Sequence, residues 1–420
     1  MVNLTKHAKK SKGEKILTKI KITYRAENIV MKPASRIYFI LFLFLIACNK
    51  NMSTKNKNVF SVEMVTPTLI DFNELVDEVS WIMLENNLNG YLRDCWKIIQ
   101  HKDYYYLYSL TDFAVCIFDK NGKFIKRIDS SIGKGSIETP CDIFIDEKND
   151  QLWILESRHF IYKYTLSGEF INQEKLPFEA VKISSINDNF LFYNGGFDKK
   201  YPYYIRLTTS DYTTLQGFVK KPKNINEMNI PVSLFTCDNN KNAVFALLPH
   251  NDTIYLGESS KGGYVSPFLH LNFGGDLLTF SDYPSQGFSD EEMAKIIVNK
   301  EKIHSITGFN FASGLLFMKS SGKDNSYRTI DIANRVGYKF NSILDNISAL
   351  SVVTAIQGST GTSLLISLPA KSLLDEYALH DNQTKYQSIK ELLNTIEPTD
   401  NRVLIELVIK DIKTRERLNH

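Results

Sequence analysis

The chain has 420 residues, of which 43% are hydrophobic and 23% are charged. This composition is typical of a globular protein and excludes a disordered or collagen-like chain. Aromatic residues reach 12%, with 26 Phe and 21 Tyr. Because these residues favour the half-buried surface of a sheet, the composition favours β-structure. No segment carries a recognisable catalytic motif, so the sequence indicates the architecture and the cellular location of the protein more than its activity.

The positive charge of the chain is concentrated at its start. Residues 1–47 contain eight Lys and two Arg against two Glu, a net charge of +8, so the remainder carries −5 of the overall +3. A chain with an acidic body has no global electrostatic attraction to nucleic acid. We therefore expect no nucleic-acid partner.

A short apolar run follows the basic start. Residues 37–47 are 11 consecutive apolar residues, whereas a membrane-spanning helix needs about 20. A run of this length behind positive charge is typical of a signal peptide, which we predict over residues 31–47. Because Met31 already begins a normal signal sequence, we expect residues 1–30 to be a non-native extension upstream of the true translation start.

The apolar run ends in Leu45-Ile46-Ala47-Cys48, which resembles a bacterial lipobox. In signals of that kind the cysteine is acylated and becomes the new N-terminus, so Cys48 is the predicted lipid-attachment residue. An uncleaved anchor or a buried strand is the alternative. Residues 48–65 begin with a polar stretch that cannot pack, and we expect them to form a flexible tether between lipid and fold. The resemblance implies a cell-envelope lipoprotein of the outer membrane, facing the periplasm or the cell surface.

From residue 100 the chain repeats with a period of about 46 residues. Residues 103–125 and 150–171 each read as strand, loop, strand, glycine turn and strand. Their turn residues Gly122 and Gly168 are 46 positions apart, and glycine supplies the positive φ that tight hairpins need. Fainter copies follow through residue 367.

Four-strand units at such a period are typical of a β-propeller. The length of the repeat region predicts an all-β, six-bladed propeller over residues 66–410, with seven blades as the alternative and a tail at 411–420. The strand-like residues 79–84 precede the first full copy and are well placed to complete the last blade. That pairing would tie the two ends of the ring together and remove an exposed sheet edge.

Two segments interrupt the strand pattern. Residues 288–300 combine a Ser289 cap, acidic residues in the first turn and apolar residues at helical spacing, which predicts a short inserted helix. Residues 386–394 predict a second helix near the C-terminus, and a strand-like segment follows at 402–410. We expect both helices at the rim of the ring.

Several short motifs follow one another in a fixed order. They are the lipobox, Leu84-Glu85, Phe118-Asp119-x-x-Gly122-Lys-Phe-Ile125, Gly133-Lys-Gly135 leading to Cys141-Asp-Ile-Phe-Ile-Asp146, Asn251-Asp-Thr-Ile-Tyr255 and Asp400-Asn-Arg-Val-Leu404. Their order resembles the six-bladed β-propeller lipoproteins of Bacteroides-type bacteria, relatives of the NHL-repeat propellers. The resemblance covers nearly all of residues 31–410. It implies a fold and an address but little chemistry, because that group mostly has no assigned activity.

Candidate binding residues are few. Tyr201 and Tyr203, near two glycines in an apparent loop, are the best candidates for exposed aromatic side chains that stack on a ligand such as a sugar ring. Packing within the sheet is the alternative for both. The eight His are scattered and never form His-Glu-x-x-His, so a zinc protease is not supported.

Two other groups of residues are candidates for a metal site and for a disulfide. Asp142, Asp146, Glu147 and Asp150 do not have the spacing of a calcium loop, and we interpret residues 146–150 as a hairpin between two strands. The remaining cysteines lie in apolar stretches and have no Cys-x-x-Cys spacing, so we expect free buried thiols, with one disulfide as the alternative. These are Cys95, Cys116, Cys141 and Cys237.

Three functions stay open at this stage. The leading hypothesis is an exported, lipid-anchored binding or scaffold protein that holds a protein, peptide or glycan and has no enzymatic activity. The second is a metal-dependent hydrolase or lyase, whose axial divalent ion would take its ligands from several blades. The third is an accessory subunit of an outer-membrane uptake or signalling complex. The sequence identifies no catalytic residue, cofactor or metal ligand.

Overall fold

The computed structural model describes residues 59–411, with gaps at 132, 223–232, 239, 241, 249, most of 280–300, 341–355 and 380–386. The expected extension, signal peptide and Cys48 lie outside the described residues, as does most of the expected helix at 288–300. Within the described part of the chain, no helix is long and apolar enough to cross a membrane.

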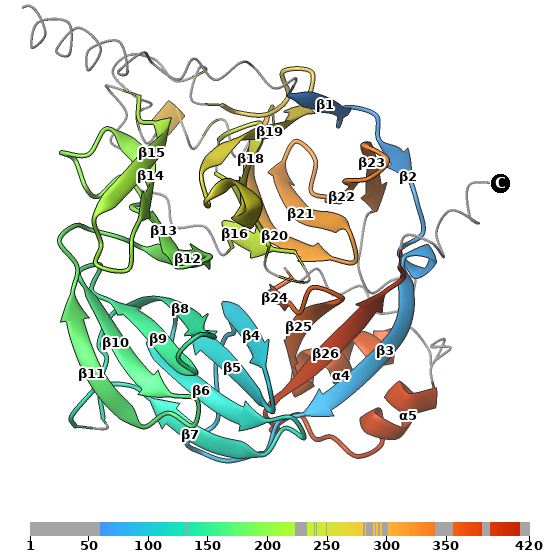
Figure 1. Ribbon diagram of the computed structural model, residues 1–420. Coiled ribbons are helices and arrows are strands. Elements are labelled where there is room, and N and C mark those ends of the chain that lie inside the picture. Colours follow the sequence, from blue (N-terminus) through green and yellow to red (C-terminus); the bar gives the residue numbers. More distant parts are fainter. Residues whose placement is uncertain are drawn as a thin grey trace, which may run out of the picture. The chain divides into compact units, whose positions relative to one another are not determined.

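Six sheets surround a common axis and form a six-bladed β-propeller (Figure 1), so the predicted fold is confirmed. The first three blades each contain four strands, given from the axis outward. Blade 1 contains β4 (Lys97–His101), β5 (Tyr104–Ser109), β6 (Ala114–Asp119) and β7 (Phe124–Ile128). Blade 2 contains β8 (Pro140–Asp146), β9 (Gln151–Glu156), β10 (Phe160–Thr165) and β11 (Phe170–Lys175). Blade 3 contains β12 (Lys182–Ile186), β13 (Asn189–Tyr193), β14 (Tyr203–Thr208) and β15 (Thr214–Lys220).

The other three blades follow the same order. Blade 4 contains β16 (Phe235–Cys237), β17 (Ala243–Leu247), β18 (Thr253–Glu258) and β19 (Val265–Asn272). Blade 5 contains β20 (Ile303–Ala312), β21 (Leu315–Gly322), β22 (Tyr327–Asp331) and β23 (Val336–Phe340). Blade 6 contains β24 (Gly358–Ser359), β25 (Ser363–Pro369), β26 (Arg402–Ile409) and β3 (Val76–Met83).

Blade 6 closes the ring with strands from both ends of the propeller. Strand β3, from the start of the propeller, pairs antiparallel with β26 from its end, in the register Met83 with Val403 and Val79 with Leu407. The predicted closing role of residues 79–84 is therefore confirmed. The connection from β3 to β4 then carries the chain from the outside of blade 6 to the inside of blade 1.

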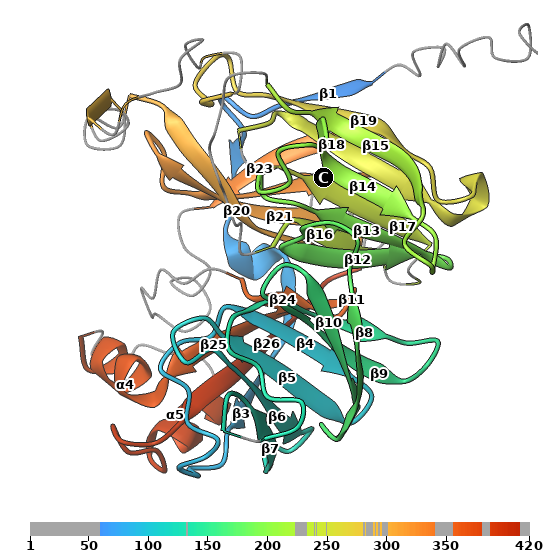
Figure 2. The ribbon, with the colours of Figure 1, turned by 90° about the vertical axis from the view of Figure 1, so that its left-hand side faces the viewer.

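The segment before β3 adds outer strands to two blades. Strand β1 (Phe60–Glu63) pairs parallel with β19 in blade 4, and β2 (Thr68–Leu69) pairs parallel with β23 in blade 5; Figure 2 shows β1 beside β19. The range 48–65 expected as tether therefore contains a strand of the propeller. The physical reason is the buried Val62, flanked by the exposed Ser61 and Glu63, which is the alternation of a half-buried strand.

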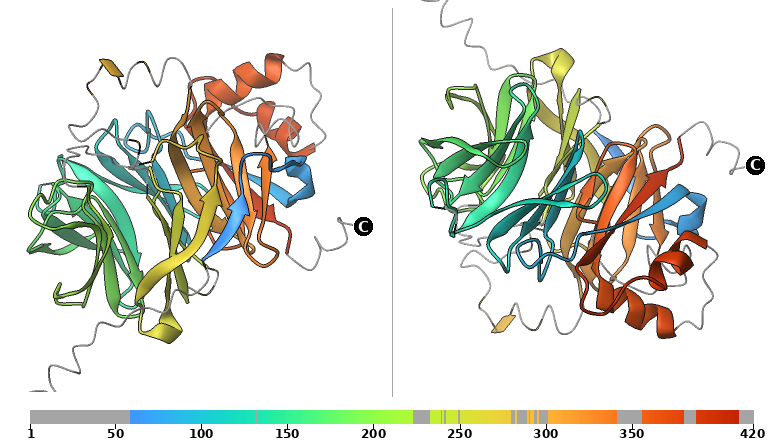
Figure 3. Two further views of the ribbon diagram at one scale, coloured as in Figure 1. Left: turned by 90° about the horizontal axis from the view of Figure 1, so that it is seen from above. Right: turned by 90° about the horizontal axis from the view of Figure 1, so that it is seen from below.

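Two helices lie between β25 and β26 and pack against blade 6 (Figure 3). Helix α5 (Gln387–Leu393) confirms the helix predicted at 386–394, whereas α4 (Ala370–Leu379) was not predicted. It follows β25 directly, and Leu373 is buried in the same cluster as strand residues of blade 6. Two 3-10 turns complete the described elements, η1 (Phe72–Glu74) and η2 (Ser259–Lys261).

The core is divided among the interfaces between blades. Within the described residues, six hydrophobic clusters each join the facing sides of two neighbouring blades. Tyr106 and Tyr108, for example, are fully buried with residues of blade 2, so this part of the tyrosine run is core. Because each sheet is covered on both sides, its central strands are apolar on both faces.

Candidate functional site

The innermost strands of all six blades line a cavity of about 430 Å³ on the axis of the ring. Apart from the outer strands β1, β2 and β3, the chain enters each blade at its innermost strand and continues outward. All six innermost strands therefore run in the same direction along the axis. We call the side where they begin the blade-joining end of the cavity, because the connections from one blade to the next lie there. The side where they stop is the opposite end.

The walls of the cavity combine apolar and neutral polar residues. Five isoleucines line it, namely Ile98, Ile99, Ile143, Ile145 and Ile183. Hydroxyl and amide side chains lie between them, including Gln100, Ser184, Thr236, Asn310, Ser359 and Thr360. The segment 358–361, which resembles no nucleophile motif, supplies part of β24 and the turn that follows it. A few polar groups in a largely preformed concave site are typical of small-molecule binding.

Three charged residues from blades 1, 2 and 3 meet at the blade-joining end. Lys97 Nζ donates hydrogen bonds to Asp142 Oδ1 and to the carbonyl oxygen of Ile143, both at 2.8 Å. Lys182 Nζ lies 3.7 Å from the same Asp142 oxygen and 3.5 Å from the carbonyl oxygen of Cys141. The other oxygen of Asp142 accepts a hydrogen bond from the backbone N–H of Ile183 at 3.1 Å.

Local strand geometry brings these side chains together. Lys97 and Lys182 are the first residues of β4 and β12, and Asp142 lies near the start of β8. The pairing of β8 with β9 shifts between Pro140 and Asp142, which leaves Cys141 as an extra residue. A β-bulge of this kind bends the strand and turns the following side chain, and here that side chain is the carboxylate between the two lysines.

The cluster of Lys97, Asp142 and Lys182 is strongly buried and has unequal charge. The side chains of Lys182 and Asp142 are 2% and 1% exposed, while that of Lys97 is 22% exposed. Burial lowers the pKa of Lys182; the charge of Asp142 opposes this shift, and the charge of Lys97 adds to it. Two amines thus share one carboxylate, and the burial of a poorly compensated ammonium is costly.

At the opposite end, positive and negative side chains are more evenly matched. His101 Nδ1 lies 3.2 Å from Glu147 Oε1, and Lys102 Nζ lies 2.6 Å from Asp150 Oδ1. Asp146 instead accepts a hydrogen bond from Asn149 within the turn between β8 and β9. The interpretation of residues 146–150 as a hairpin is confirmed.

The two tyrosines proposed as exposed ligand contacts lie away from this cavity, at the start of β14 in blade 3. Both are half-buried, with ring centroids 5.7 Å apart, and a Cβ at Gly217 would touch both of them. The Arg206 guanidinium covers the ring of Tyr201 at 3.7 Å and forms an ion pair with Asp198 at 3.0 Å. Much of the aromatic surface is therefore occupied within blade 3, and the role of both tyrosines in binding stays a prediction.

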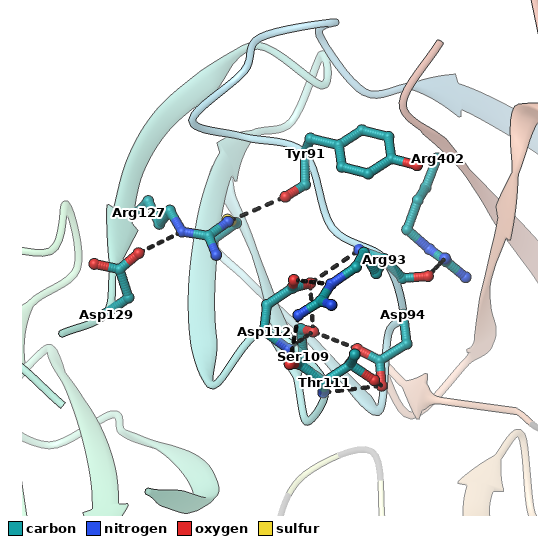
Figure 4. A network of polar contacts seen from close by, with 10 residues as sticks. Tyr91, Arg93, Asp94, Ser109, Thr111, Asp112, Arg127, Asp129 and Arg402 are labelled. Atoms are coloured by element: carbon teal, nitrogen blue, oxygen red, sulfur yellow. Dashed lines mark hydrogen bonds and ion pairs between the residues drawn. The ribbon is translucent and has the colours of Figure 1, made fainter. Parts of the chain in front are cut away.

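A second buried polar cluster lies where blades 6 and 1 meet (Figure 4). Arg402 donates from Nε to Ser367 Oγ at 2.6 Å, from Nη2 to the Ser367 carbonyl at 2.9 Å and from Nη1 to the Arg93 carbonyl at 3.2 Å. Asn401 Nδ2 donates to the carbonyl oxygens of Glu85 and Gly90. We call this cluster the closing junction, because it fixes the connection from β3 to β4.

Neighbouring residues extend the closing junction into blade 1. Arg93 Nε donates to Asp112 Oδ1 at 2.6 Å, and Thr111 Oγ1 donates to Asp94 Oδ2 at 2.9 Å. These contacts hold the connection from β3 to β4 against the loop between β5 and β6 (Figure 4). The junction is a structural arrangement, since its acceptors are mostly backbone carbonyls.

The described residues contain no group of three or more His, Cys, Asp or Glu side chains placed to hold one metal ion. The four described cysteines are free, and Cys95 and Cys116 are buried as expected, whereas Cys141 and Cys237 are only partly buried. Sequence reasoning singled out Asp142 but missed Lys97 and Lys182. A usable signal exists in the repeat, because Lys97 and Asp142 are 45 positions apart, close to one period, so they occupy similar places in successive blades.

Of two similar solved structures, the one from Bacteroides fragilis supports the fold. The chain is similar to a Bacteroides fragilis protein described as exported, with a TM-score of 0.71 and 18% sequence identity, over 84% of this chain and 100% of that chain. A protein from the DUF4221 family of Bacteroides vulgatus gives a TM-score of 0.49 and 11% identity, over 80% of this chain and 97% of that chain. No curated protein matches the sequence.

Family comparison covers almost the whole propeller. Residues 57–407 match the family described as a domain of unknown function, DUF4934. The match begins just before β1 and ends within β26, so it includes the outer strands, all six blades and the closing pair. This chain belongs to the DUF4934 family.

Proposed function

We propose that this protein is an exported, lipid-anchored binding protein whose axial cavity takes a small polar ligand. The observation that carries the proposal is the cavity of about 430 Å³, to which the innermost strands of all six blades contribute. Its volume falls within the range of about 300–1,000 Å³ usual for small-molecule sites. The closed ring makes the cavity rigid, and rigid sites lose little entropy when a ligand binds.

Attachment to the membrane forms the second part of the proposal. The lipobox-like Leu45-Ile46-Ala47-Cys48 lies at the end of a run of 11 apolar residues, and the Bacteroides fragilis protein described as exported has the same fold. An acylated Cys48 would hold the propeller at the envelope surface. Expression in a Bacteroides host with an alkyne-labelled fatty acid should label the wild-type chain and leave Cys48→Ala unlabelled. Label that persists in Cys48→Ala would disprove attachment at this residue.

Ligand binding can be tested with methyl groups in the cavity wall. In protein labelled at isoleucine δ1 methyls, we expect at least one class among neutral hexoses, hexuronates, amino acids and dipeptides to shift the signals of Ile99, Ile143 and Ile183 in NMR spectra. Ile171, which is exposed on the outer strand β11 of blade 2, serves as the remote control. If millimolar concentrations of every class leave the axial signals as unchanged as that of Ile171, the axial binding function is wrong.

A further inference from the structure

The axial cavity differs in charge between its two ends. At the blade-joining end, the described side chains of Lys97 and Lys182 face one carboxylate, that of Asp142. At the opposite end, Lys102 pairs with Asp150, His101 pairs with Glu147, and Asp238 adds a further carboxylate to the lining. The electrostatic potential inside the cavity therefore favours an anion at the lysine end and disfavours one at the other end.

Lys97 is placed to receive that anion. Its side chain lines the cavity and keeps 22% of its surface exposed. Its ammonium has three N–H bonds, and the described residues supply two acceptors, Asp142 Oδ1 and the Ile143 carbonyl oxygen. One donor is left for a group inside the cavity. Lys182, directly behind Asp142, adds positive charge that its poorly placed acceptors offset only in part.

The remaining lining fits a ligand with many hydroxyl groups. Neutral side chains that both donate and accept hydrogen bonds follow the wall from the lysine end toward the opposite end. Among them are Gln100, Ser184, Thr236, Ser359 and Thr360. Among the lining isoleucines, the partly exposed Ile99 offers apolar surface that could cover the face of a sugar ring, whereas the others are buried in the wall. Such a wall would pair each ligand hydroxyl without placing a second full charge beside it.

We infer that the axial cavity binds a sugar acid or a similar hydroxyl-rich carboxylate, with the carboxylate hydrogen-bonded to Lys97. The inference rests on the proposed axial binding function and specifies its ligand class. A carboxylate at Lys97 would give the two amines a second negative partner, so the charge of the cluster would balance. Hydrogen bonds that involve charged groups in such sites are stronger than neutral ones.

Glucuronate and glucose are the matched probes, because they differ only by the carboxylate at C6. We expect glucuronate to shift the methyl signals of Ile143 and Ile183 with at least about tenfold higher affinity than glucose, given the usual strength of a charged hydrogen bond. The variant Lys97→Met should weaken glucuronate binding at least about tenfold and glucose binding by a clearly smaller factor. Lys126→Met is the control, since Lys126 is also ion-paired, with Glu169, but does not line the cavity.

The outcomes separate this inference from the proposed function. Equal affinities for the two sugars, or full glucuronate affinity in Lys97→Met, would overturn the sugar-acid inference while axial binding stands. If neither sugar shifts the axial methyls, the sugar-acid inference also fails, and the wider panel then decides the axial function. Asp142 keeps Lys182 and the Ile183 N–H as partners in Lys97→Met, so we expect that variant to fold. If it does not, the comparison of the two sugars on the wild type still decides.

Discussion

Two buried cations in this propeller are held in opposite ways. Arg402 at the closing junction donates three hydrogen bonds, all to oxygens of Ser367 and Arg93 at 2.6–3.2 Å. Lys182 in the axial cluster has acceptors only at 3.5 and 3.7 Å within the described residues. Burial lowers the pKa of both groups. The hydrogen-bond donors of the junction are therefore used to hold distant parts of the chain together. The axial cluster, in contrast, keeps donors that can bind another molecule.

The largest effect should follow from removing the carboxylate that both lysines share. Asp142→Asn leaves Lys97 and Lys182 buried without a negative partner, and breaking a buried ion pair from one side costs about 3–5 kcal/mol. We expect the free energy of unfolding, measured by urea titration, to fall by about that amount. The exposed pair of Asp103 with Lys120 gives the control, because Asp103→Asn should leave the free energy of unfolding nearly unchanged. A loss of under 1 kcal/mol in Asp142→Asn would contradict the role of Asp142 as the shared partner of the two amines.

A slightly smaller loss is expected at the closing junction. Asn401→Ala removes hydrogen bonds to the part-buried carbonyl of Glu85, to the buried carbonyl of Gly90 and from the buried N–H of Arg402. Each buried group left without a partner costs about 1–3 kcal/mol, so we expect a total loss of about 2–4 kcal/mol in urea titration. Binding of a ligand in the axial cavity should be unchanged in the folded variant. A variant that loses affinity but not stability would reverse the roles assigned to the two clusters.

The contact between blades 6 and 1 also depends on a glycine turn. Gly122 has a φ of +83°, and a Cβ there would lie 2.2 Å from the carbonyl oxygen of Met83 at the end of β3. We expect Gly122→Ala to cost at least about 1–2 kcal/mol from its left-handed backbone alone, with the clash adding to this. Gly133 is the matched control, since its φ is +76° and nothing lies within 4 Å of the added Cβ. Equal losses in both variants, measured by thermal unfolding, would show that backbone strain and not the closing contact matters at Gly122.

The fold was largely predictable from the sequence because its main signals lie in short stretches of the chain. The 46-residue period, the turn glycines and the alternation within strands each act over a few residues, and Gly122 and Gly168 indeed have φ of +83° and +89°. The outer strand β1 was missed because it pairs with a strand about 200 residues away, and no local signal separates it from the polar stretch before it.

The candidate site was less predictable because, like the pairing of β1, it joins residues that lie far apart in the sequence. Lys97, Asp142 and Lys182 come from three blades, and each is an ordinary charged residue at the start of a strand. These three side chains come together because of the closed ring and the bulge at Cys141. No sequence motif predicts either feature at these positions. The surroundings of Tyr201 were not predictable from local composition either, since Arg206 covers its ring.

The smallest effect, and the sharpest contrast with Asp142→Asn, is expected for Lys182→Met. This variant removes the poorly compensated ammonium and leaves Asp142 paired with Lys97 at 2.8 Å. Replacement of a buried charge by an apolar side chain of similar length is often neutral or stabilising, so we expect an unfolding free energy within about 1 kcal/mol of wild type, or higher.

The pH dependence of the unfolding free energy provides a second test of Lys182→Met. The pKa of Lys182 is lowered from 10.5 in the folded protein, so between the folded value and 10.5 the unfolded chain binds more protons, and wild-type stability rises with pH there. Lys182→Met should lack that rise, so its advantage over wild type should shrink as the pH increases toward 10.5. A loss above about 2 kcal/mol in Lys182→Met, or an advantage that grows with pH, would place Lys182 with Arg402 among the cations that hold the ring together.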